Sequence, residues 1–297
     1  MKGNKMAYEQ ILYEVSEHIA TITLHRPEAM NSYTPLMCDE INAALDEADN
    51  DPDVRVVIFT GGEGTKKPVF CAGFDLNYSD NPFSYLTDYS VYDAEDTGGM
   101  NAIRLYEMKK PVIAAINGSA VGVGISMTLP MDIRICSENS KMGFVFAKRG
   151  FVCDACSSWF LPKIVGISKA AELAMTGRII NAEEALRIGL VTEVVPQDQV
   201  YARAREVAKE ILVNCSPMSV AMCRQMMYQA CGARNPMFSH KLESVCYHYV
   251  ATSPDAEEGA KAFLEKRNPD WKTNPATDMP GNYPWLPKMQ FPKNVQE

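Results

Sequence analysis

Residues 110–127 read KPVIAAINGSAVGVGISM, and this stretch decides how the rest of the chain is arranged. Residues 112–116 form a short apolar run behind a proline, which predicts a buried strand. An Asn-Gly turn follows, and Gly122 and Gly124 allow one backbone segment to approach another without a Cβ clash. Residues 123–129 suit the start of a buried helix. A strand that passes through glycines into a helix leaves backbone N–H groups where negative charge is favoured.

The spacing of these glycines argues against a nucleotide site. Met127 stands where a dinucleotide fingerprint needs its third glycine, and no Gly-Lys-Ser/Thr follows for a phosphate loop. Taken alone, the stretch fits a glycine-rich corner without any ligand equally well. A second stretch, VFCAGFDL at residues 69–76, is another strand that ends in a turn of small residues. Two such corners can point two N–H groups at one oxyanion.

Four motifs, in order along the chain, carry a resemblance to a known family. FCAGFDL at residues 70–76 looks like the first oxyanion-hole segment of the crotonase (enoyl-CoA hydratase/isomerase) superfamily. Residues 110–134 resemble the second segment, residues 166–195 the downstream portion, and the EKR of residues 265–267 the C-terminal helix. The chain is therefore identified as a member of this superfamily over roughly residues 8 to 268. The resemblance implies an α/β fold, a crotonase-like spiral of ββα units with a C-terminal helical region.

The composition of the chain narrows the classes of function. With 297 residues, 46% of them hydrophobic, the chain can bury a large core. A net charge of −8 argues against nucleic acid as the main partner, and no apolar run approaches the ~18 residues of a membrane span. Nine scattered cysteines are typical of a reduced intracellular protein, and four histidines are too few for a metal centre. Without a signal peptide or a peroxisomal ending, we expect a cytoplasmic protein.

The resemblance implies three parts along the chain. Residues 1–195 form the spiral core with the oxyanion hole and the acyl-CoA site, residues 196–268 a C-terminal helical oligomerisation region, and residues 269–297 an extended Pro-rich tail. A polar and aromatic insertion at residues 77–99 is expected to be mobile, and the resemblance implies that it covers the acyl pocket. Family members form trimers, often paired, so the resemblance implies a homotrimer or a hexamer.

The resemblance also implies where the acid–base groups should be. Family hydratases place two glutamates across the substrate double bond, because adding water needs one group to activate it and another to manage the Cα proton. Aligned by motif, Ser126 and Phe146 stand at these two positions, so a conventional two-glutamate hydratase is not predicted. The oxyanion donors implied by the family are the backbone N–H groups of Phe74 and Val123.

One carboxyl remains near the aligned positions, that of Asp154. In family Δ3,Δ2-enoyl-CoA isomerases a single glutamate stands at this place, and in chlorobenzoyl-CoA dehalogenases an aspartate there is the nucleophile. Moving a proton between two carbons on one face needs only one carboxylate and a stabilised enolate. The alternative is that Asp154 caps the helix predicted through Trp159.

Further positions match family contacts to coenzyme A or the acyl group. The loop before the first long helix, the first oxyanion segment and the C-terminal helix supply them. They are Arg26, Met30, Ser32, Ala72, Asp75, Leu76, Gly122, Phe146, Phe263 and Lys266. Two of them have interpretations that need no CoA contact. Asp75 could do no more than stabilise its own turn, and Lys266 could be a charged side chain on a solvated helix face.

The sequence thus predicts an acyl-CoA enzyme that stabilises a thioester enolate. Isomerisation of an enoyl-CoA with Asp154 as the base is the first hypothesis, and hydration is the second. The CoA thioester is the substrate, so no separate cofactor and no metal are expected. The alternatives are a non-catalytic acyl-CoA-binding or scaffold protein, and a dehalogenase- or thioesterase-like hydrolase with Asp154 as nucleophile.

Overall fold

The structure is a computed structural model that describes residues 8–79, 94–285, 287 and 291. Its strands are β1 (Ile11–Ser16), β2 (Ile19–Leu24), β3 (Val56–Gly61), β4 (Val69–Cys71), β5 (Val112–Ile116), β6 (Ser119–Val121), β7 (Ile133–Ser137), β8 (Lys141–Gly143), β9 (Ile180–Asn181) and β10 (Glu193–Val195). Its α-helices are α1 (Pro35–Asn50), α3 (Thr97–Glu107), α4 (Val123–Ser126), α5 (Ser157–Val165), α6 (Ile167–Thr176), α7 (Ala182–Arg187), α8 (Val200–Asn214), α9 (Pro217–Ala230), α10 (Pro236–Ala251) and α11 (Pro254–Glu265). Short 3₁₀ turns are η1 (Pro27–Ala29), η2 (Ala147–Arg149) and η3 (Gln197–Gln199).

The larger of two sheets has six strands in the order β1-β2-β3-β5-β7-β10. Only β1 and β2 are antiparallel, and the other neighbours run parallel. The strand predicted at residues 112–116 is confirmed as β5, in the middle of this sheet between β3 and β7. All five of its residues are buried, because helices or the second sheet cover both of its faces. A strand covered on both faces reads as a continuous apolar run rather than as an alternating one.

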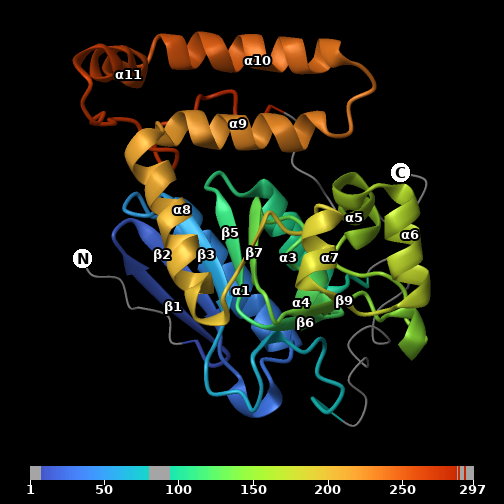
Figure 1. The fold of residues 1–297 in the computed structure, drawn as a ribbon. Helices are drawn as coiled ribbons and strands as arrows, with labels where there is room; N and C mark the ends of the chain where they lie inside the picture. The colour runs from blue at the N-terminus through green and yellow to red at the C-terminus, as the bar shows by residue number, and fades with distance from the viewer. Residues whose placement is uncertain (1–7, 80–93, 286, 288–290, 292–297) are drawn as a thin grey trace.

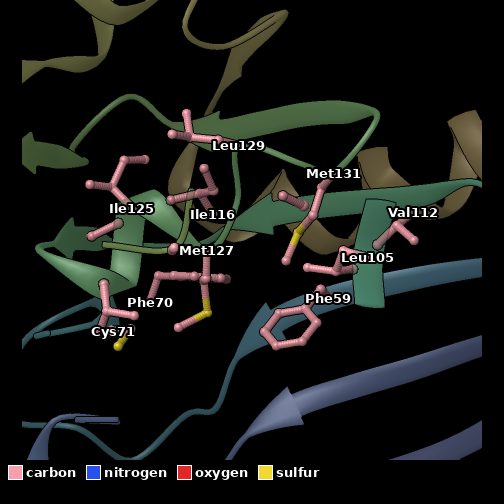
Figure 2. Close-up of a cluster of buried hydrophobic side chains, with 14 of the residues drawn as sticks. Phe59, Phe70, Cys71, Leu105, Val112, Ile116, Ile125, Met127, Leu129 and Met131 are labelled. Carbon is pink, nitrogen blue, oxygen red and sulfur yellow. The ribbon is translucent and has the colours of Figure 1, made fainter. Parts of the chain in front are cut away.

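The second sheet, β4-β6-β8-β9, is built from very short strands that pack onto the first. The rings of Phe59 on β3 and Phe70 on β4 lie with their centroids 6.1 Å apart. Figure 2 shows these rings together with Ile116 of β5 and Ile125 of α4, in one buried cluster. The glycine-rich segment that leaves β5 therefore lies against the end of β4.

The last helices form an arm beyond the core (Figure 1). The apolar side of α8 packs on the outer face of the six-stranded sheet, so the boundary predicted at residue 195 separates α8 from the sheet that it covers. In contrast, α9 and α10 lie side by side and share a small core of their own around Met222 and Cys246. Arg224 joins α9 to the spiral core, since its Nε lies 2.9 Å from Asp132 Oδ2 and its other nitrogens donate to the carbonyls that end α3.

Most of the predicted elements are confirmed, and one helix is wrong. The alternation of Thr and aliphatic residues at 21–24 predicts a hairpin, and Thr34-Pro35 predicts the start of a helix. Both elements are present, as β1 with β2 and as α1, and Thr34 Oγ1 accepts a hydrogen bond from Met37 N at 3.1 Å. The helix predicted at residues 123–129 is a single turn, α4. A Cβ on Gly124 would lie 2.4 Å from the Cys71 carbonyl oxygen, so this turn lies directly against β4. A single turn is too short to produce the helix dipole that the sequence predicted here. An anion at this place would be stabilised by hydrogen bonds from individual N–H groups instead.

Two further predictions concern the insertion and the tail. Residues 80–93 of the predicted insertion lie outside the described residues. The end of the insertion forms the start of α3, a helix that no sequence pattern had indicated. Residues 269–285, which belong to the predicted tail, contain no helix or strand. They pack on the arm, where the Tyr249 hydroxyl donates to the Asp278 carbonyl. Within the described part of the chain, none of the helices has the length and apolar character needed to cross a bilayer, and there is no cluster of metal-binding side chains.

Candidate active site

Two glycine corners meet at the end of β4 and β6. Gly73 has a φ of 104° and Gly122 a φ of 58°, values that residues with a side chain rarely adopt. A Cβ on Gly122 would lie 3.9 Å from Gly73 Cα, and one on Gly73 would lie 3.0 Å from the Val121 carbonyl oxygen. The two corners predicted from the sequence are therefore in direct contact.

The residue after each of these glycines carries one of the predicted donors. Tyr33 N donates to the Gly73 carbonyl and Asp75 N donates to the Tyr33 carbonyl, both at 2.8 Å. Because a trans peptide points its carbonyl and its N–H in opposite directions, the Phe74 N–H points away from Tyr33. Val123 opens α4, so its N–H has no partner within the helix. Both donors thus follow a glycine of positive φ at the point where the corners meet.

The Asp154 carboxyl reaches back to the glycine-rich segment. Ser126 on α4 is fully buried, and its Oγ donates to Asp154 Oδ1 at 2.5 Å. The helix α5 begins only at Ser157, and Cys156 precedes it without any side-chain capping bond. The interpretation of Asp154 as a helix cap is therefore wrong. Ser126, predicted from the motifs to stand at a family glutamate position, contacts the Asp154 carboxyl.

The backbone that follows Asp154 is strained. Ala155 has a φ of 50° and Cys156 a φ of 53°, so two successive residues that are not glycine adopt the left-handed conformation. Ala155 is fully buried, and Gly98 of α3 packs against it so closely that a Cβ there would lie 3.1 Å from that of Ala155. Such strain persists only where the surrounding structure fixes the backbone, and it concentrates at functional sites.

The environment of Asp154 favours its neutral form. Burial raises the pKa of Asp154 from 3.8 to about 7. The hydrogen bond from Ser126 acts in the opposite direction and lowers the pKa, while the negative charge of Asp96 raises it further. A carboxyl whose pKa is about 7 can both take up and release a proton at neutral pH, which suits a general acid–base group.

We expect Asp154→Asn to stabilise the protein at alkaline pH. The folded-state pKa of Asp154 is above its ordinary value, so the folded state binds the extra proton and stability falls as pH rises towards about 7. Between pH 5 and pH 7 the free energy of unfolding falls by at most about 2–3 kcal/mol, because each pH unit between the unfolded and the folded pKa is worth about 1.4 kcal/mol. Urea denaturation should therefore show that the free energy of unfolding of the variant rises relative to that of the wild type from pH 5 to pH 8. The exposed Asp198→Asn is the control, and an equal gain there would contradict the assignment.

The predicted CoA-side residues lie together around the first oxyanion segment. Arg26 Nη2 is 2.9 Å from Asp75 Oδ2, and its Nη1 donates to the Ser32 carbonyl at 2.8 Å. Ala72 N donates to the Met30 carbonyl at 3.2 Å, which ties the loop to the end of β4. Asp75 Oδ1 also accepts from the next turn, so it fixes that turn in addition to pairing with the arginine. Leu76 follows this group and is half-exposed.

The remaining predicted residues fall into two places. Phe146 lies over the second corner, since its Cε1 would be 3.9 Å from a Cβ on Gly122. Phe263 and Lys266 lie at the end of α11, where the Phe263 side chain is 82% exposed. Figure 1 shows α11 beyond α9, on the far side from α4. Within one chain, the structure does not bring these two residues to the glycine corners.

Comparison with known proteins agrees with this architecture. A family model described as enoyl-CoA hydratase/isomerase matches residues 14–274. The chain belongs to this crotonase family. The crotonase relatives include the enoyl-CoA hydratase ACTT3 of Alternaria alternata, which is 41% identical over 255 residues, covering 86% of this chain and 83% of the relative. The (E)-benzylidenesuccinyl-CoA hydratase of Thauera aromatica is 35% identical over 267 residues, 88% of this chain and 98% of the relative.

The crotonase fold is also found in solved structures. A probable enoyl-CoA hydratase/isomerase from Mycobacterium abscessus superimposes with a TM-score of 0.78 at 31% identity, covering 88% of this chain and 98% of that one. The α/β class predicted from the sequence is thereby confirmed.

Sequence reasoning missed two features of this crotonase site. The first is the Ser126–Asp154 hydrogen bond, which no local pattern signals because the two residues are 28 positions apart. The second is Asp96, the N-cap of α3, whose Oδ1 accepts from Gly99 N at 2.6 Å. An aspartate three residues before a helical N–H is a recognisable cap signal, but it lay inside the predicted insertion.

Proposed function

We propose that this protein is an acyl-CoA enzyme that isomerises an enoyl thioester through an enolate. The observation that carries the proposal is the Asp154 carboxyl, held by Ser126 on the helix turn whose first residue is Val123. Its pKa of about 7 suits proton exchange at neutral pH. One exchangeable carboxyl beside two converging corners supports a reaction that needs one base and one oxyanion site.

In the proposed reaction the thioester carbonyl lies between the N–H groups of Phe74 and Val123. Asp154 removes a proton from C2 of a 3-enoyl-CoA, the electron pair moves into the carbonyl, and the negative charge develops on its oxygen. Collapse of the dienolate draws the proton from Asp154 onto C4 and leaves a 2-enoyl-CoA. Donors that are already in place stabilise the oxyanion without reorganisation. The CoA thioester is the substrate, and the proposal needs no separate cofactor.

The hydroxyl of Ser126 supports this role for a single carboxyl. A carboxylate offers about four acceptor positions, so the bond to Oδ1 leaves capacity for a substrate proton. That bond also fixes the orientation of the carboxyl, which favours transfer between two carbons on one face of the substrate.

The test is turnover of a series of 3-enoyl-CoA thioesters of increasing chain length. The proposal expects formation of the 2-enoyl isomer, followed by its absorbance, with part of the C2 proton retained at C4 when the reaction is run in D₂O. Retention is expected because one carboxyl carries the proton from C2 to C4. Absence of isomerisation across the series, with CoA thioesters bound, would contradict the proposal.

Hydration is the second candidate, because relatives at 35–41% identity are described as enoyl-CoA and benzylidenesuccinyl-CoA hydratases. Here Asp154 alone would activate a water and return its proton to C2. Formation of a 3-hydroxyacyl-CoA from the 2-enoyl-CoA at a higher kcat/KM than isomerisation would assign the protein to this reaction.

The two remaining alternatives have their own signatures. A scaffold protein would bind CoA thioesters in calorimetry and turn over none of them. A dehalogenase-like enzyme would form an ester between Asp154 and the substrate carbon that loses halide. A thioesterase-like enzyme would form a mixed anhydride on Asp154 as the CoA thiol leaves. Mass spectrometry of the quenched protein detects either adduct.

We also propose that the protein assembles through its arm, as a trimer or a pair of trimers. The helices α10 and α11 carry exposed apolar side chains, namely Met237, Val245, Tyr247, Phe263 and Leu264. Exposed apolar side chains that gather into a patch mark interaction sites. Mass photometry should show a trimer or a hexamer at low protein concentration, and a clean monomer would contradict the assembly. In such an assembly Phe263 and Lys266 would reach the CoA of a neighbouring subunit.

A further inference from the structure

The N-terminus of α3 packs directly against the corner that carries Asp154. Asp96 Oδ1 accepts hydrogen bonds from two segments, from Gly99 N at 2.6 Å in its own helix and from Ala155 N at 3.2 Å in the corner. Ala155 is the first of the two left-handed residues and adjoins Asp154 in the chain. The side chain of Asp96 is therefore a direct link between the helix and the strained backbone.

The first turn of α3 is itself rigidly placed. The Tyr33 hydroxyl donates to Asn101 Oδ1 at 2.5 Å, and Cys38 Sγ donates to the Thr97 carbonyl at 3.2 Å. Tyr33 and Asn101 are both buried. The backbone of Tyr33 also forms the bridge to Phe74, so one buried network fixes both Asp96 and the first corner.

We propose that Asp96 is a positioning residue, which holds the Asp154 corner through its bond to Ala155 and uses its charge to keep Asp154 a strong enough base at neutral pH. This inference rests on the proposed function of Asp154 and adds the group that tunes it. Asp96 touches no reacting atom in this role.

Asp96 differs from the other groups that face Asp154 in the described structure because it carries a charge at neutral pH. Ser126 on α4 presents a hydroxyl, and Tyr33, Cys71 and Cys156 present groups that titrate only at alkaline pH. Burial raises the pKa of Cys71 to about 12 and that of Cys156 to about 11, and it raises the pKa of Tyr33 well above 10. These groups are therefore neutral at pH 7, whereas Asp96 is negatively charged and raises the pKa of Asp154.

The experiment separates the charge of Asp96 from its hydrogen bonds. In Asp96→Asn an amide oxygen still accepts from both N–H groups, but the charge is gone, so the ascending limb of kcat/KM against pH should move to lower pH by roughly half to one unit. The difference should shrink at high salt, since Asp96 is exposed and its charge is screened. Asp96→Ala should show the same displacement together with a lower Tm and a lower kcat.

A second readout does not need turnover. Infrared difference spectra can follow the carbonyl stretch of protonated Asp154, assigned by its loss in Asp154→Asn, and its titration should move to lower pH in Asp96→Asn. Glu95→Gln removes an equal charge from the neighbouring exposed residue and should move the titration much less.

The outcomes are distinct. Superimposed titrations of the wild type and Asp96→Asn would overturn the inference, as would an equal displacement in Glu95→Gln. A displaced infrared titration in a protein without turnover would support the inference and overturn the proposed isomerase instead.

Discussion

Asp154→Ala is expected to lower kcat for the 3-enoyl-CoA by about 10²–10⁴-fold while leaving CoA-thioester binding nearly unchanged. The physical reason is that a positioned general base contributes an acceleration of this size. In the described structure no other carboxyl is hydrogen-bonded to Ser126. The measurement is steady-state isomerisation beside calorimetric binding of a saturated acyl-CoA, which cannot react.

Asp154→Asn is the matched variant for this test. It keeps an oxygen that can accept from Ser126 Oγ, so the local structure is preserved while the base is lost. Both variants should lose turnover to a similar degree, and Asp198→Ala on an exposed site should lose none. Full turnover in Asp154→Ala would show that the base lies elsewhere.

Phe74→Pro is expected to lower kcat by roughly a hundred- to a thousand-fold. Removal of one oxyanion-hole donor costs about 2.7–4 kcal/mol in other enzymes, and proline removes this backbone donor because it has no N–H. The bridge to Tyr33 uses the Gly73 carbonyl and the Asp75 N–H, so the substitution leaves both of these bonds possible. Circular dichroism should confirm the fold before rates are compared.

Two variants show whether the backbone donor or the side chain carries this effect. Phe74→Ala removes only the ring and should lose much less activity than Phe74→Pro. Val123→Pro removes the second donor at the first residue of α4, a position where proline is tolerated, and should lose activity to a similar degree as Phe74→Pro. Equal losses in Phe74→Ala and Phe74→Pro would mean that the ring, as a wall of the pocket, carries the effect.

Elements with a strong local pattern could be predicted from the sequence. The alternation of Thr21 and Thr23 with Ile22 and Leu24 predicts the hairpin of β1 and β2, α1 follows a Thr-Pro cap, and β5 is a five-residue apolar run. By contrast β6, β8 and β9 have only two or three residues each, too few to show a period, so the second sheet was not predicted as such. The length of α4 was not predicted either, and its close approach to Cys71 on β4 is a contact that no local pattern signals.

The sequence by itself determined the family and the two glycine corners, and it predicted Asp154 as the candidate carboxyl. These are encoded locally, since glycine adopts a positive φ without strain and the motifs are contiguous. Tertiary structure alone decided what Asp154 can do. Its partners Ser126 and Asp96 come from distant segments, and a pKa of about 7 arises from the burial that those segments produce together. Desolvation and charge depend on distance in space rather than along the chain, which is why an aspartate that reads like a helix cap becomes a candidate base.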